Sequence, residues 1–173
     1  LFSSGPEKWI PPRKGRTHAL RVVREVLAME SATGEATSLA AACEAAARAL
    51  KRRSILFLVS DFLDEGYEPA LALAARRHEV IPLVLRDPAE LALPRVGLIE
   101  LQDLETGERR LVDTSDPGVR REFAARARGL EEARLQERLR PAGVDPIFFE
   151  VGGDLFDPLH RYFRQRARRR SAG

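Results

Sequence analysis

Two kinds of hydrophobic spacing alternate along the chain. Mainly apolar runs cover residues 54–60, 80–85 and 147–151, and the first of them, unbroken over 55–59, ends abruptly at Ser60 and Asp61. Between these runs, apolar positions recur every three or four residues, as they do on one face of a helix. Short unbroken runs are typical of strands that are buried on both faces of a parallel sheet. The alternation therefore predicts an α/β domain with a mostly parallel sheet flanked by helices on both faces.

The helical spacing predicts helices over residues 18–30, 67–77 and 117–139, another that begins after Thr37 or Ser38, and a last one after the turn at Gly152-Gly153. Apolar stripes mark their inward faces: Leu20, Val23 and Leu27 in the first helix, and Val119, Phe123, Ala127 and Leu130 in the long one.

Three further segments have strand-like patterns. Residues 97–103 and 109–113 flank a Gly-containing turn and predict a β-hairpin. Residues 8–14 run into two prolines and predict a short edge strand. Pro82 has no backbone N–H to donate, so we expect the run over 80–85 to lie toward an edge of the sheet.

Composition narrows the class of protein. The chain has 173 residues, which suffices for one domain with a substantial core. No apolar run approaches the roughly 20 residues that span a bilayer, and no signal peptide is visible. Its one cysteine, Cys43, excludes an intrachain disulfide and favours a reducing, cytoplasmic compartment, with membrane association of an intact protein left open. Because the first residue is not Met, we expect an N-terminally shortened chain.

The net charge of +3 is a property of the C-terminal end. Residues 161–173 hold six arginines and no acid, which leaves 23 basic against 26 acidic residues in the first 160, a net charge of −3. We therefore divide the chain into a domain over 1–165 and a basic tail over 166–173. A solvated tail is the simpler interpretation, and contact with nucleic acid or an anionic membrane is the alternative.

Asp61 is the main candidate for chemistry, because ligands of α/β proteins bind beyond the carboxyl ends of the strands. A carboxylate there is a metal ligand, a catalytic group or a helix cap. A phosphohydrolase that uses Asp61 as its nucleophile is one alternative, but Asp64 follows one residue too late for the Asp-x-Asp motif of haloacid-dehalogenase-like enzymes. His18, His78 and His160 show no metal-ligand spacing.

Seven short motifs occur in order along the chain, at 11–21 (PPRKGRTHALR), 36–39 (ATSL), 52–62 (RRSILFLVSDF), 75–81 (ARRHEVI), 87–90 (DPAE), 93–97 (LPRVG) and 103–107 (DLETG). Together they resemble the bacterial family called domain of unknown function 58, whose core is similar to the von Willebrand factor A domain. The resemblance extends from residue 1 to about residue 165.

The resemblance implies a metal-ion-dependent adhesion site, in which three loops at the sheet edge hold Mg²⁺ or Mn²⁺. By position, Thr37 matches the second-loop ligand and Asp61 the third-loop ligand, with Ser60 and Asp64 as candidates for supporting them. The first loop, Asp-x-Ser-x-Ser, does not occur; the nearest string covers 113–117 and ends in proline. We therefore expect the first strand and the first metal loop to be missing, and no tightly bound metal.

By resemblance, the expected function is that of a non-enzymatic protein-interaction module that works with a MoxR-type AAA+ ATPase in assembly or chaperone activity, with no small-molecule substrate. A metal-independent scaffold domain is the first alternative and the Asp61-dependent phosphohydrolase the second. Because a sheet without its first strand invites pairing with another chain, a homodimer is a further expectation.

Overall fold

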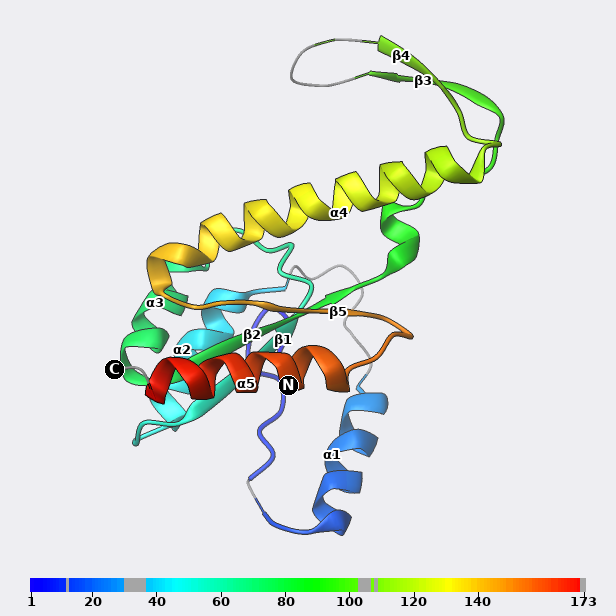
Figure 1. Ribbon diagram of the computed structural model, residues 1–173. Coiled ribbons are helices and arrows are strands. Elements are labelled where there is room, and N and C mark those ends of the chain that lie inside the picture. Colours follow the sequence, from blue (N-terminus) through cyan, green and yellow to red (C-terminus); the bar gives the residue numbers. More distant parts are fainter. Residues whose placement is uncertain (12, 30–36, 103–106, 108, 172–173) are drawn as a thin grey trace. The chain divides into compact units, whose positions relative to one another are not determined.

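The computed structural model describes residues 1–11, 13–29, 37–102, 107 and 109–171 (Figure 1). The elements of the described residues follow in the order α1 (Arg16–Leu27), α2 (Leu39–Ala49), β1 (Ile55–Ser60), α3 (Glu68–Arg77), β2 (Glu79–Arg86), the 3-10 helix η1 (Pro88–Leu91), β3 (Leu98–Gln102), β4 (Arg109–Asp113), α4 (Pro117–Leu139), the 3-10 helix η2 (Arg140–Ala142), β5 (Ile147–Glu150) and α5 (Phe156–Ser171).

Strands β1, β2 and β5 form one sheet in that order. β2 and β5 are parallel, with Leu83 opposite Ile147 and Arg86 opposite Glu150. Helix α3 connects β1 to β2, which is the usual connection between parallel strands. The mixed α/β class with a mostly parallel sheet is thus confirmed.

The predicted hairpin is also present. β3 and β4 pair antiparallel, with Leu98 opposite Asp113 and Gln102 opposite Arg109. They form a separate two-stranded sheet, as Figure 1 shows. The predicted turn falls mostly on residues 103–106 and 108, which lie outside the described residues.

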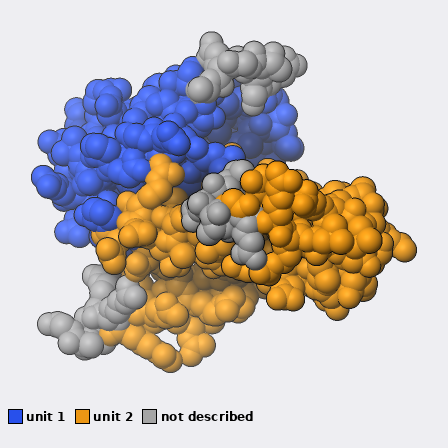
Figure 2. Space-filling model, turned by 90° about the horizontal axis from the view of Figure 1, so that it is seen from above, with its two compact units in different colours: residues 1–58, 62–81, 141–144 blue, residues 59–61, 82–140, 145–173 orange. Residues whose placement is uncertain are grey.

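The described chain divides into two compact units, drawn in blue and orange in Figure 2. The first comprises residues 1–58, 62–81 and 141–144, and the second residues 59–61, 82–140 and 145–173. In the first unit α2 packs against α3, and the most deeply buried side chains are Leu39, Cys43, Tyr67, Leu71, Ala74 and Ile81. In the second unit the core is formed by Val84, Leu135, Leu139, Ile147 and Phe149.

Strand β1 is less buried than its sequence predicts. Leu58 is 5% exposed, but Ile55, Phe57 and Val59 are 44–49% exposed. The expectation of burial on both faces was therefore wrong for β1, because it lies at one end of the three-stranded order while β2 lies in the middle. The edge position expected for β2 was wrong as well. Pro82 precedes the β2–β5 ladder, which begins at Leu83, so its missing N–H does not interrupt those bonds.

Helix α1 begins two residues before the predicted start. Gly15 is its N-cap, with a φ of 104° that suits glycine, so Thr17 lies in the first turn and does not cap the helix. No residue of α1 is buried, and the predicted inward stripe of Leu20, Val23 and Leu27 is exposed. The described residues of segment 8–14 contain no strand, so that prediction was wrong too.

Helix α4 has the predicted bounds but a different buried face. Phe123 and Leu130 of the predicted stripe are exposed, whereas Leu135 and Leu139 near the C-terminal end are buried. The spacing of apolar residues therefore predicted the position of the helix correctly, but it did not predict which of its turns are buried. Across the described residues, every helix is too short or too polar to cross a lipid bilayer.

Cys43 is expected to be inert toward thiol reagents in the folded protein. It is 1% exposed on α2, and burial, with a smaller contribution from Glu44, raises the pKa of its thiol to about 11. At pH 8 about one thiol in a thousand is then a thiolate. Labelling with a chromogenic disulfide should be slow in buffer and complete in urea; rapid labelling in buffer would show that the α2 face opens easily.

Candidate functional site

The chain turns sharply where β1 ends. Ser60 is the last residue of the strand, and its hydroxyl donates to Oδ1 of Asp61 at 3.2 Å. Asp61 is exposed, and Phe62 follows with a φ of 62°, a left-handed conformation that is costly for a bulky side chain. The Phe62 ring is buried and packs edge-on against Tyr67, with the ring centroids 5.8 Å apart. Burial of the Phe62 ring offsets the energy cost of this backbone conformation. The Asp61 carboxylate lies at the surface.

Asp64 has a structural role that its sequence context does not reveal. Its Oδ2 accepts a hydrogen bond from the backbone N–H of Leu39 at 2.7 Å, and its Oδ1 accepts one from the N–H of Glu65 at 2.7 Å. Leu39 is the first residue of α2, so Asp64 satisfies one of the N–H groups that a helix start leaves without an intrahelical partner. The loop after β1 is thereby tied to the start of α2.

The start of α2 also settles which residue caps it. The side chain of Ser38 accepts from the N–H of Ala41 at 3.2 Å, so Ser38 is the N-cap. Thr37 lies one residue outside the helix and is exposed. Thr37 belongs to the first unit and Asp61 to the second. A site shared by these two residues therefore stays a prediction, whereas the contact between Asp64 and the α2 start is observed.

The donors at these positions have the chemistry of a hard-metal site. Mg²⁺ prefers hydroxyl, carboxylate and water oxygens, which Thr37, Ser60 and Asp61 would supply. Both oxygens of Asp64 accept backbone N–H groups, so its hydrogen bonds are explained without an ion. Within the described ranges, no three or more Asp, Glu, His or Cys side chains gather as a metal-binding group. The donor types fit such an ion, and a full coordination sphere needs further oxygens.

The string over 113–117 connects a strand to a helix. Asp113 ends β4 and accepts from the N–H of Ser115 at 2.8 Å, while Asp116 caps α4 by accepting from Gly118 at 2.6 Å. The Thr114 hydroxyl is buried and donates to the carbonyl of Gly97 at 2.7 Å. Each of these side chains stabilises the local backbone, and their hydrogen bonds account for the string without a metal.

The family described as "Protein of unknown function DUF58" matches residues 1–133. The chain belongs to the DUF58 family. No solved structure matches it.

Relatives of this DUF58 chain occur in mycobacteria. Uncharacterized proteins of Mycobacterium tuberculosis and Mycobacterium bovis are each 34% identical over 167 residues, which is 95% of this chain and 52% of the relative. The chain thus spans about half the length of these curated relatives. A protein of Paracoccus denitrificans, named "uncharacterized protein in moxR 3'region", is 37% identical over 102 residues, which is 56% of this chain and 92% of the relative.

Proposed function

We propose that this chain is part of a von Willebrand A-like, non-enzymatic interaction module that works with a MoxR-type AAA+ ATPase in assembly or chaperone activity. The observation that carries the proposal is the Paracoccus relative, whose name places it in the moxR 3' region. Neighbouring bacterial genes often encode proteins that act in one process. A physical interaction between the two products is the most direct form of such a link.

The docking point in this proposal is the surface around Asp61. Docking needs groups that a partner can reach, and both Asp61 and Thr37 are exposed. In the intact protein these two residues hold Mg²⁺ or Mn²⁺ together with further oxygens, and Ser60 and Asp64 support them. A bound divalent ion supplies a positive charge that accepts a carboxylate of the partner. The hydroxyl of Ser60 donates to Asp61, and an acceptor that is already oriented lowers the entropy cost of docking.

The test measures the affinity of the intact protein that contains this chain for a MoxR-type ATPase from the same organism, with Mg²⁺ and with EDTA. Asp61→Ala is expected to weaken binding about tenfold or more in Mg²⁺, because an ion bridge to a partner acid is lost. Glu65→Ala is the matched control, since Glu65 is an exposed acid in the same loop. Its affinity should stay within about twofold of the unchanged chain.

Two other outcomes lead to the alternatives. Binding that needs Asp61 but ignores EDTA identifies a metal-independent scaffold, in which the same loop docks by hydrogen bonds. Metal-dependent hydrolysis of p-nitrophenyl phosphate that disappears in Asp61→Ala identifies the phosphohydrolase. Equal affinities for Asp61→Ala, Glu65→Ala and the unchanged chain would refute any docking role for Asp61.

A further inference from the structure

A second surface, on and before helix α1, has no part in the proposed function. Residues 8–24 contain no acid and six cations: Lys8, Arg13, Lys14, Arg16, Arg21 and Arg24. This cluster overlaps the first of the seven sequence motifs, at 11–21. It is distinct from the Arg-rich tail, which lies at the other end of the sequence.

Most of these cations surround one open recess of about 560 Å³, which we call the α1 recess. Its lining residues are Arg13, Lys14, Thr17, His18, Leu20, Arg21 and Arg24. From Thr17 onward they lie on successive turns of one face of α1. The recess is in the size range of pockets that hold small ligands, and its polar groups are mainly cations and a hydroxyl.

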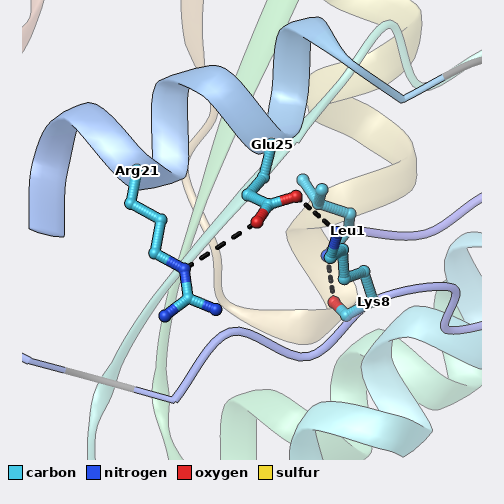
Figure 3. Close-up of polar contacts among 4 residues, drawn as sticks. All are labelled: Leu1, Lys8, Arg21 and Glu25. Atoms are coloured by element: carbon cyan, nitrogen blue, oxygen red, sulfur yellow. Dashed lines mark hydrogen bonds and ion pairs between the residues drawn. The ribbon is translucent and has the colours of Figure 1, made fainter.

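The charge of the α1 recess is largely unbalanced. Glu25 forms ion pairs with Lys8 and with Arg21, the latter at 3.8 Å, as Figure 3 shows. The hydrogen bond from Lys8 lowers the pKa of Glu25, and the charges of Lys8, Arg21 and Arg24 add to this, so Glu25 is ionised at neutral pH. In the part of the chain that the structure describes, no carboxylate forms an ion pair with Arg13 or Lys14.

We propose that the α1 recess binds a compact polyphosphate group, either free or as the phosphate chain of a nucleotide. Arginine pairs with phosphate oxygens through two parallel N–H groups, and lysine adds a mobile point charge. The Thr17 hydroxyl supplies one more donor among the lining residues. A triphosphate brings three to four negative charges into one site, which matches the excess of cations around the α1 recess.

The close spacing of the cations also argues against an acidic peptide as the ligand. In an extended peptide, side chains on one side are roughly 7 Å apart, so only one or two carboxylates would enter a single recess. The four cations of the lining are all contributed by residues 13–24. They favour a ligand that carries its charges close together.

To test this proposal, the affinity of the 173-residue chain is measured by titration calorimetry with three ligands: inorganic tripolyphosphate, ATP in EDTA, and a hexaglutamate peptide. Saturable binding of tripolyphosphate is expected, and hexaglutamate should bind at least about tenfold more weakly. Equal affinity for ATP and tripolyphosphate means that the phosphates alone are recognised, whereas tighter ATP binding assigns the site to nucleotides. Both results support the proposal.

Two double variants each remove two positive charges, one from the α1 recess and the other, as the matched control, from outside it. Arg13→Ala with Lys14→Ala should weaken tripolyphosphate binding about tenfold or more. Lys51→Ala with Arg53→Ala removes one exposed lysine and one exposed arginine outside the recess, and should leave affinity within about twofold. Far-UV circular dichroism checks that both remain folded.

Three results would overturn the proposal: equal losses in the two double variants, tighter binding of hexaglutamate than of tripolyphosphate, or no saturation with any phosphate. The inference does not depend on the proposed function. Asp61→Ala should keep full tripolyphosphate affinity, and the Arg13/Lys14 variant should keep its Mg²⁺-dependent affinity for the ATPase. Failure of one proposal therefore leaves the other testable.

Discussion

Replacing Arg86 by alanine is expected to destabilise the protein by about 3 kcal/mol. The Arg86 side chain is 7% exposed, and its Nη1 donates to Oε1 of Glu132 at 2.6 Å. Its Nε lies 3.4 Å from Glu131, and its guanidinium lies 4.0 Å from the centre of the Phe148 ring. Arg86 thus joins β2, α4 and β5 in the second unit. Truncation removes this packing and leaves two carboxylates of α4 without their cation.

Arg128→Ala is the matched control for Arg86→Ala. Arg128 also joins α4 to β5, through an ion pair with Glu150 at 2.6 Å, but both side chains are 40–42% exposed. Because water screens such a pair, its loss should lower the free energy of unfolding by about 0.5 kcal/mol or less. Urea unfolding followed by circular dichroism measures both values. If the two variants lose equal stability, the network around Arg86 is no stronger than a surface ion pair.

Elements with strong local signals were predictable from the sequence. Helix α4 extends over Pro117–Leu139, as predicted, because Asp116 and Pro117 are a clear helix start. The hairpin of β3 and β4 was predictable for a similar reason, since two β-type runs flank a short turn with glycine. In each case the decisive interactions are between residues close in sequence.

Burial was not predictable in the same way. The apolar stripe of α1 and the apolar run of β1 show which side chains share a face, but not whether another element covers that face. Leu27 is 81% exposed and Phe57 is 44% exposed, although both fit their patterns. What covers a residue depends on elements that are distant in sequence, and local spacing carries no information about them.

The sequence indicates which residues could form the candidate site, but it does not reveal the structural role of Asp64. The metal site predicted at Thr37 and Asp61 stays a prediction, and the structure shows one contact nearby, from the N–H of Leu39 at the start of α2 to Asp64 in the loop after β1. Asp64 itself was expected to support metal ligands, and its hydrogen bonds show that it first of all caps a helix. The partner N–H belongs to a residue 25 positions earlier, so no local motif identifies this cap.

Replacing Asp64 by alanine is therefore expected to destabilise the protein by about 2 kcal/mol. The substitution removes the acceptors for the N–H groups of Leu39 and Glu65, and hydrogen bonds to a charged acceptor are stronger than neutral ones. Leu39 is fully buried, so water replaces the lost acceptor poorly. Asp64→Asn keeps one carbonyl oxygen and should lose about half as much. Thermal and urea unfolding measure these differences.

The proposed docking role of Asp61 predicts a different result for Asp61→Ala. Asp61 is exposed at the end of β1, so its loss should change the free energy of unfolding by about 0.5 kcal/mol or less. We therefore expect the two substitutions to differ: Asp64→Ala lowers the stability of the protein, whereas Asp61→Ala keeps the stability and, under the proposed function, weakens Mg²⁺-dependent docking. A loss of stability in Asp61→Ala as large as in Asp64→Ala would make Asp61 a second structural acid. The docking role would then be tested at Thr37, which lies outside α2 and next to its N-cap, Ser38.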